Sequence, residues 1–298
     1  MGKTALIFPG QGAQYVGMAK DFYDNFSESK NAFDTASDII GIDMKKLCFE
    51  DNDKINLTEY TQVALVTACT AILRPFISNC EFDVCAGLSL GEYMALVANK
   101  AVSFEDAIKL TRKRGIYMQE AVPVGVGGMA AVIGINQEVI EEICSKYSEN
   151  LTVANFNTPQ QFVISGKNES LEKVTEELKQ AGAKRIVPLK VSGPFHSPLL
   201  IDAGEKLKAE LDSIEINKPE VPYVSNYTGE YVYEKDLIKE YLAKQVYSSV
   251  RWTQSVQNMI DNGVTDFIEV GPGKTLSALV KKIDRNVNVK NIEKITDL

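Results

Sequence analysis

The sequence predicts an α/β fold in which a domain with a parallel sheet carries a smaller inserted domain. In the first and last thirds of the chain, short apolar runs that end at Gly or Pro alternate with helical apolar patterns, as in proteins with parallel sheets. Between them, strand and helix patterns follow the order β-α-β-β-α-β, which is typical of a ferredoxin-like unit. The 298 residues are enough for a large domain that carries a smaller one.

The first third supplies two strand–helix units. We predict strands at 4–8 and 82–86, and helices at 59–77 and 92–100. Pro9-Gly10 ends the first strand and Gly87 ends the second, because these residues favour turns over continued strands.

The middle of the chain begins with a glycine-rich stretch at 123–128. After it we predict, in order, a strand at 129–133, a helix at 137–147, strands at 151–154 and 161–165 joined by a turn at 157–159, a helix at 169–182 and a strand at 185–189. We therefore expect a ferredoxin-like small domain at 124–189 and a large domain made of 1–123 and 190–298.

The last third returns to the α/β pattern. We predict strands at 221–225 and 266–270, and helices at 247–262 and 275–284. These elements complete the parallel-sheet domain.

Composition excludes several classes of protein. The formal net charge of −8 argues against non-specific binding to nucleic acid or to anionic membranes. The five cysteines are odd in number and form no Cys-x-x-Cys pair, so neither a disulfide framework nor a metal site is indicated. We find no stretch long and apolar enough to span a bilayer and no signal peptide, and we expect a soluble cytoplasmic protein.

One turn carries a candidate nucleophile, Ser89. It lies between a predicted strand and a predicted helix, in Gly87-Leu88-Ser89-Leu90-Gly91. Gly-x-Ser-x-Gly in this context is typical of a nucleophile elbow, and the N–H of Leu90 is then the natural oxyanion donor. The alternative is a tight turn with an incidental serine.

The chain contains a single histidine, His196. A serine hydroxyl needs a base to act as a nucleophile, so a histidine base can only be His196. It lies in a loop bracketed by Gly193-Pro194 and Pro198. No acidic residue stands out as the partner that orients the imidazole, and a backbone carbonyl could do so instead.

Arg114 lies on the apolar face of a predicted helix that Ser103 and Asp106 open. Arg112 and Lys113 point to the other, solvated face. A buried guanidinium requires a partner. Either an internal carboxylate or a carboxylate on the substrate could supply it.

Two glycine-rich loops follow predicted strands. The first, Phe8-Pro9-Gly10-Gln11-Gly12-Ala13-Gln14, could place the N–H of Gln11 against a reacting oxygen. The second, Gly271-Pro272-Gly273-Lys274-Thr275, imitates a P-loop, but Ile268 stands where that motif requires glycine. We therefore expect no nucleotide-phosphate site there.

These motifs, in this order and together with Glu269-Val270-Gly271-Pro272-Gly273, resemble the malonyl-CoA:acyl carrier protein transacylases of fatty acid synthesis. The resemblance covers essentially the whole chain. It is more distant for the acyltransferase domains of polyketide synthases. It implies a hydrolase-like α/β domain with an inserted ferredoxin-like domain, and a ping-pong transfer through a malonyl-serine.

The resemblance also implies the role of each site residue. Ser89 is the nucleophile, His196 the base and then the acid, and Arg114 the group that binds the malonyl carboxylate. The N–H groups of Gln11 and Leu90 form the oxyanion hole. The backbone carbonyl of Gln245 orients the histidine, and Phe195 indicates malonyl selection.

One departure is visible, since many members of the family have histidine where this chain has Leu88. That histidine is not the base, so the chemistry is unaffected. The resemblance implies no cofactor, because CoA enters and leaves with the substrate. Malonyl-CoA and acyl carrier protein are the expected partners, and we expect a monomer.

Carrier proteins of this kind are acidic, so an acidic enzyme needs a local basic patch for docking. The candidate docking residues are Lys184, Arg185, Lys190, Lys281 and Lys282. Two other functions remain open at this point: a serine thioesterase or esterase that uses water as acceptor, and a non-catalytic binding module.

Overall fold

The computed structural model describes residues 2–123 and 125–298 and contains two sheets. The larger sheet has the strand order β10-β9-β1-β2-β7-β8. All of its neighbouring strands run parallel except β7 and β8, which confirms the predicted α/β fold. Its strands are β1 (Lys3–Phe8), β2 (Val84–Gly87), β7 (Tyr223–Val224), β8 (Tyr231–Val232), β9 (Val264–Val270) and β10 (Asn288–Ile292).

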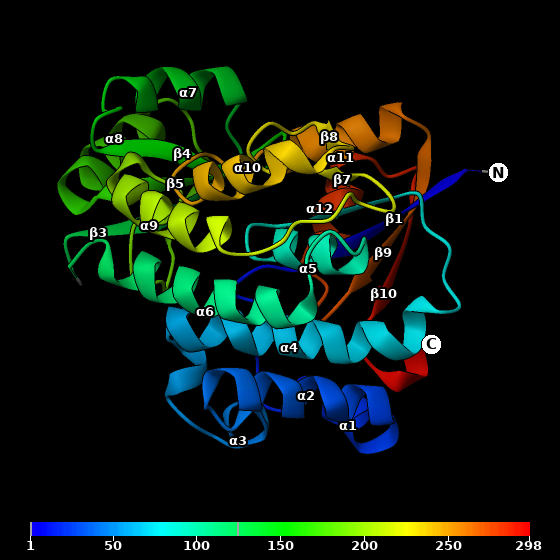
Figure 1. The fold of residues 1–298 in the computed structure, drawn as a ribbon. Helices are drawn as coiled ribbons and strands as arrows, with labels where there is room; N and C mark the ends of the chain where they lie inside the picture. Colours follow the sequence, from blue (N-terminus) through cyan, green and yellow to red (C-terminus); the bar gives the residue numbers. More distant parts are fainter. Residues whose placement is uncertain (1, 124) are drawn as a thin grey trace.

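Helices cover both faces of this sheet (Figure 1). On one side, α2, α4, α6, α9 and α10 pack one upon the next, and α5 lies between them and the strands β1 and β2. On the other side, α11 and α12 pack against β9. The helices of this domain are α1 (Lys20–Asn25), α2 (Ser27–Ile40), α3 (Met44–Phe49), α4 (Thr58–Ile77), α5 (Gly91–Ala98), α6 (Phe104–Glu120), α9 (Ile201–Asp212), α10 (Ile238–Gln245), α11 (Trp252–Asp261) and α12 (Thr275–Ile283).

Strand β1 shows why both faces are covered. Leu6 and Phe8 belong to the core that contains α4 and α5, whereas Ala5 and Ile7 belong to the core around Trp252. Successive side chains of a strand point to opposite faces, and all four are fully buried. An apolar run without alternation is typical of such a strand.

The second sheet is antiparallel and has the order β4-β5-β3-β6. It consists of β3 (Gly127–Ile133), β4 (Leu151–Thr158), β5 (Gln161–Lys167) and β6 (Arg185–Pro188), and α7 (Gln137–Ser145) and α8 (Asn168–Gln180) share its core. This is the ferredoxin-like arrangement that the sequence predicts. Position 124 lies outside the described residues, so the exact domain limits (1–123 with 190–298, and 124–189) stay a prediction.

Several elements differ from the sequence-based expectations. The predicted helix at 247–262 begins only at Trp252, because the backbone of Val250 is hydrogen-bonded to β4. The predicted turn at 157–159 begins later, since β4 continues to Thr158. The strands β8 and β10 and the helices α1, α2, α3, α9 and α10 were not predicted.

Helix α4 corrects the expectation that no stretch could span a membrane. Its 20 residues, with a mean hydropathy of 1.3 over the most apolar window, are long and apolar enough by length and composition alone. In the fold, 72% of that window is buried, between α2, α6 and α5. A helix that is apolar on all sides is expected in the centre of a large core as well as in a membrane.

Candidate active site

Ser89 occupies a strained turn between β2 and α5. Its φ is 53°, in the left-handed region that non-glycine residues rarely adopt. A Cβ on Gly87 would overlap the backbone of Gly91, and a Cβ on Gly91 would overlap the carbonyl of Phe8. The two glycines therefore allow the turn to close against β1 and hold Ser89 at the carboxyl edge of the sheet.

His196 lies beside Ser89 and also has a positive φ, 55°. The Oγ of Ser89 lies 2.7 Å from Nε2 of His196, and Nδ1 lies 2.8 Å from the carbonyl oxygen of Gln245. If Nδ1–H donates to that carbonyl, Nε2 is left to accept the serine proton. Burial, with the nearby charge of Arg114 as a second cause, lowers the pKa of His196 to about 4, so the imidazole is a neutral base at neutral pH.

Arg114 reaches the same point from α6 and is only 1% exposed. Its Nη1 donates to Oε1 of Gln62 at 2.9 Å, and its Nη2 donates to Oε1 of Gln245 at 2.9 Å and to Oγ of Ser89 at 3.1 Å. Among the described residues no carboxylate lies within ion-pair distance of it. The internal salt bridge, one of the two possibilities left by the sequence, is therefore not found. On the same helix, Arg112 is not fully solvated as expected, because it pairs with Glu59 at 2.7 Å.

Four polar side chains to which the sequence analysis gave no role support this pair. Asn226 accepts from the N–H of Ser89 at 2.6 Å and donates to the carbonyl of Gly87 at 2.7 Å. The side-chain amide of Gln245 donates to the carbonyl of Ser89 and to Oε2 of Glu92, both at 2.8 Å. Glu92 is fully buried, which raises its pKa to about 7.

The fourth of these side chains, that of Gln62, accepts from Nη1 of Arg114 at 2.9 Å. Because these hydrogen-bonded residues lie far apart in the chain, they form no local sequence pattern. Only Glu92, which directly follows Gly91 of the Ser89 turn, lies where the sequence could have pointed to it. The network fixes the peptide groups around Ser89 and the direction of the guanidinium.

Two backbone N–H groups are available as oxyanion donors. In the described part of the chain, the N–H of Gln11 and the N–H of Leu90 make no hydrogen bond with protein. Leu90 immediately precedes α5, where amide groups and the helix dipole favour negative charge. The N–H of Ser89 itself is taken by Asn226.

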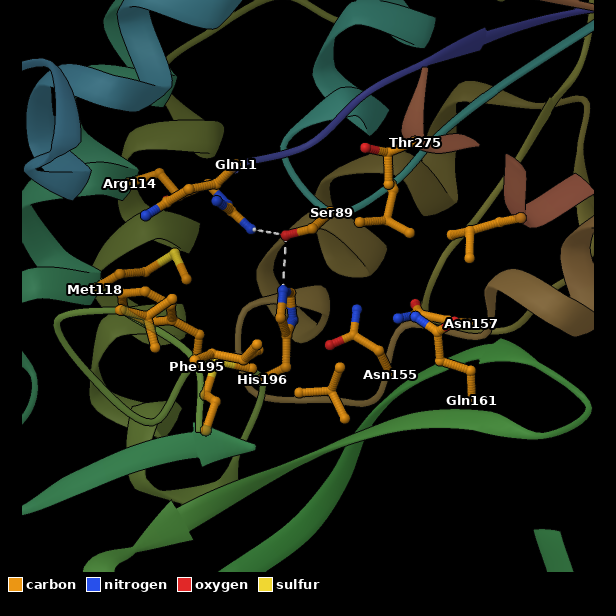
Figure 2. A pocket seen from close by; sticks show the side chains of 16 residues that line it. Gln11, Ser89, Arg114, Met118, Asn155, Asn157, Gln161, Phe195, His196 and Thr275 are labelled. Carbon is orange, nitrogen blue, oxygen red and sulfur yellow. Dashed lines mark hydrogen bonds between the residues drawn. The ribbon is translucent and has the colours of Figure 1, made fainter. Parts of the chain in front are cut away.

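A pocket surrounds Ser89 and His196 between the two sheets (Figure 2). From the large domain it is lined by Gln11, Arg114, Met118 and Phe195, among others; from the strands of the small domain it is lined by Met129, Asn155, Asn157, Gln161 and Val163. Most of the lining is apolar, and a few polar groups face Ser89. Such pockets at the carboxyl ends of parallel strands are typical of binding sites.

None of the five candidate docking residues is among the described residues that line the pocket. Lys184, Arg185 and Lys190 are exposed at the two ends of β6. Lys282 donates to the side chain of Gln161, which lines the pocket. Lys281 donates to the carbonyls of residues 285 and 287 and thus closes the end of α12.

The loop that imitates a P-loop binds its own helix. Both carboxylate oxygens of Glu269 accept from N–H groups at the start of α12, those of Leu276 and Ser277, at 3.0 and 2.7 Å. The donors that a phosphate would use are therefore occupied.

Comparison with known proteins identifies the family. The profile of the acyl transferase domain matches residues 5–296. The malonyl CoA-acyl carrier protein transacylase of Bacillus subtilis (strain 168) is 46% identical over 292 residues, which is 96% of this chain and 92% of the relative.

Solved structures agree with this match. The malonyl CoA-acyl carrier protein transacylase from Clostridium perfringens superposes with a TM-score of 0.95 and 46% identity, over 99% of this chain and 94% of that one. A malonyl-transacylase in complex with a type II PKS acyl-carrier protein superposes with a TM-score of 0.96 and 37% identity, over 99% of this chain and 97% of that one. With the family profile, a relative of 46% identity and this fold in agreement, the chain belongs to the acyl transferase domain family.

Proposed function

We propose that the protein transfers the malonyl group of malonyl-CoA to the phosphopantetheine thiol of an acyl carrier protein, through a malonyl-Ser89 intermediate, and so supplies fatty acid synthesis in the cytoplasm. The observation that carries the proposal is the position of Arg114, a fully buried guanidinium 3.1 Å from Ser89 Oγ. Among the described residues it has only neutral partners, so a carboxylate on the acyl group would answer its charge. Relatives at 42–46% identity carry the corresponding name.

Acylation begins when His196 Nε2 takes the Oγ proton of Ser89, at the 2.7 Å separation of the resting site. Oγ attacks the thioester carbon, and the oxygen that gains negative charge binds the free N–H groups of Gln11 and Leu90. The tetrahedral intermediate then collapses, the C–S bond breaks, and the thiolate of CoA receives the proton from His196. The product is malonyl-Ser89, with the malonyl carboxylate on Arg114.

Transfer repeats these steps in reverse with a new thiol. The phosphopantetheine thiol gives its proton to His196, and its sulfur attacks the ester carbon. The C–O bond to Ser89 then breaks, and Oγ takes the proton back from His196. Because the pKa of His196 is lowered to about 4, the imidazole is free to accept a proton at the start of each half-reaction.

A serine thioesterase or esterase would keep Ser89 and His196 and would use water as acceptor. A hydrolase of neutral acyl groups has no use for a buried arginine at its nucleophile, and this observation favours the transferase. An enzyme that serves polyketide synthesis would perform the same transfer to another carrier protein. A binding module without catalysis does not need a base within 2.7 Å of the serine hydroxyl.

The test is to follow the acyl group. Incubation with malonyl-CoA alone should give one malonyl adduct per chain, on Ser89, by mass spectrometry, and Ser89→Ala should give none. Adding holo-acyl carrier protein should move the adduct to the carrier, whereas apo-carrier, which lacks the thiol, should not. Loss of the adduct to water at the same rate with either carrier form would show that the protein is a hydrolase.

A further inference from the structure

Glu92, the second residue of α5, carries a fully buried carboxylate directly after the nucleophile turn. Its Oε2 accepts from the side-chain amide of Gln245 at 2.8 Å and from the backbone N–H of Asn226 at 3.2 Å. Its Oε1 is buried and, within residues 2–123 and 125–298, has no hydrogen-bond partner. In the same part of the chain, no basic side chain lies within ion-pair distance of it. Fully buried carboxylates are usually paired, so this one requires an explanation.

Hydrogen bonding does not account for the charge of Glu92. Both of its partners also hold the backbone of Ser89, because Gln245 donates to the carbonyl of Ser89 at 2.8 Å and Asn226 accepts from its N–H at 2.6 Å. A glutamine in place of Glu92 would offer an acceptor oxygen to the same two donors without the cost of burying a charge. The carboxylate must therefore have an electrostatic role.

The positive charge of Arg114 lies one side chain away from Glu92. Oε1 of Gln245 accepts from Nη2 of Arg114 at 2.9 Å, while Nε2 of the same amide donates to Glu92. The oxygen end of the amide dipole thus meets the cation and the nitrogen end meets the anion, which is the favourable orientation between two opposite charges. Gln245 therefore connects a buried cation to a buried anion that does not touch it.

We propose that Glu92 is the internal counter-charge of Arg114 and sets how strongly the enzyme prefers a malonyl group to an uncharged acyl group. The inference rests on the proposed function. While Glu92 is ionised, it offsets part of the positive charge that attracts the malonyl carboxylate. When Glu92 is neutral, that attraction acts in full. Glu92 works through Gln245 and Arg114 and is therefore a positioning residue, not a catalytic one.

The protonation of Glu92 makes this preference depend on pH. Burial raises the pKa of Glu92 to about 7, and its hydrogen bonds and the charge of Arg114 oppose this rise. Among the described residues, the other titratable groups that face Glu92 are Tyr93 on α5 and Tyr223 on β7, and burial raises the pKa of both hydroxyls. His196, with a pKa of about 4, is also neutral near pH 7. The preference for malonyl should therefore fall as the pH rises and Glu92 ionises.

The experiment measures kcat/KM for formation of acyl-Ser89 with malonyl-CoA and with acetyl-CoA, in wild type and in Glu92→Gln, at pH values on both sides of about 7. Glutamine keeps the shape of the side chain and one acceptor oxygen but removes the charge. In wild type, the malonyl-to-acetyl ratio should fall by on the order of tenfold as the pH rises, a typical coupling between two sites. In Glu92→Gln, the ratio should keep the higher value at every pH.

The ratio is taken within one preparation, so partial unfolding of a variant does not change it. Glu105→Gln is the control, because it removes a negative charge from the exposed side of α6. Equal changes for both donors in Glu92→Gln, or a pH trend that persists in this variant, would overturn the inference while leaving malonyl transfer intact.

If Glu92→Gln does not fold, the wild-type enzyme decides, since a malonyl-to-acetyl ratio that stays constant across the same pH range would also overturn the inference. Absence of any malonyl adduct on the wild-type chain would instead overturn the proposed function, and this inference with it.

Discussion

Replacing Arg114 by methionine should abolish the preference for a malonyl group. Methionine keeps the length and most of the volume of the side chain but removes the charge. A malonyl carboxylate would then be buried against neutral groups, since Arg114 is 1% exposed and its partners are the amides of Gln62 and Gln245. Removing one member of a buried charge pair costs about 3–5 kcal/mol. That corresponds to a loss of roughly a hundredfold to a few thousandfold in kcat/KM for malonyl-CoA.

Acetyl-CoA has no carboxylate to lose, so its kcat/KM should change far less. The assay measures the rate of acyl-Ser89 formation with each donor by mass spectrometry. Lys113→Ala is the matched control, because it removes a positive charge from the exposed side of the same helix. If malonyl and acetyl rates fell by the same factor in Arg114→Met, the guanidinium would act on the nucleophile and not on the acyl carboxylate, and the assignment would be wrong.

Three further outcomes follow from the site. The acylation rate of the wild-type enzyme should fall only as the pH drops through about 4, where His196 becomes protonated. In Arg114→Met this fall in rate should occur at higher pH, because the loss of the positive charge stabilises the imidazolium. A wild-type rate that already falls near the ordinary histidine pKa would contradict the reasoning. Gly91→Ala should lower both the thermal midpoint of unfolding and the acylation rate, since the new Cβ overlaps the carbonyl of Phe8 at the end of β1. Overpacking of this kind costs about 1–3 kcal/mol of stability. A variant with the thermal midpoint of the wild type would show that the turn can relax. The double change Lys184→Glu and Arg185→Glu should raise KM for carrier protein and leave KM for malonyl-CoA unchanged. If KM for carrier protein were the same in this variant as in the wild type, these two residues would not belong to the docking surface.

The fold could be predicted where local pattern and final structure agree. Strand β1 is buried on both faces from Ala5 to Phe8, so it appears as an uninterrupted apolar run that ends at Pro9-Gly10. Strand β10 (Asn288–Ile292) has the sequence NVKNI, which has little apolar character. It forms because its backbone pairs with β9 at the edge of the sheet, and sequence alone does not contain that pairing.

The site was predictable to the extent that its chemistry requires rare residues. Gly-x-Ser-x-Gly and a single histidine leave few choices, and an arginine on an apolar face requires an explanation. Asn226 was missed because it binds Ser89 across 137 positions of sequence. Neither its type nor its neighbours distinguish it from an asparagine in an ordinary turn.

Gln245 shows most clearly where sequence reasoning ends. The family resemblance assigned it through its carbonyl oxygen, which holds Nδ1 of His196. Any residue at this position would offer a carbonyl, so that role does not account for a glutamine. The side chain does, because it bonds Arg114 through Oε1 and both Ser89 and Glu92 through Nε2. A single fully buried residue thus connects the base, the nucleophile and the group proposed to bind the acyl carboxylate. A shift of the Arg114 guanidinium on substrate binding would therefore act directly on the Gln245 hydrogen bonds that hold the Ser89 turn.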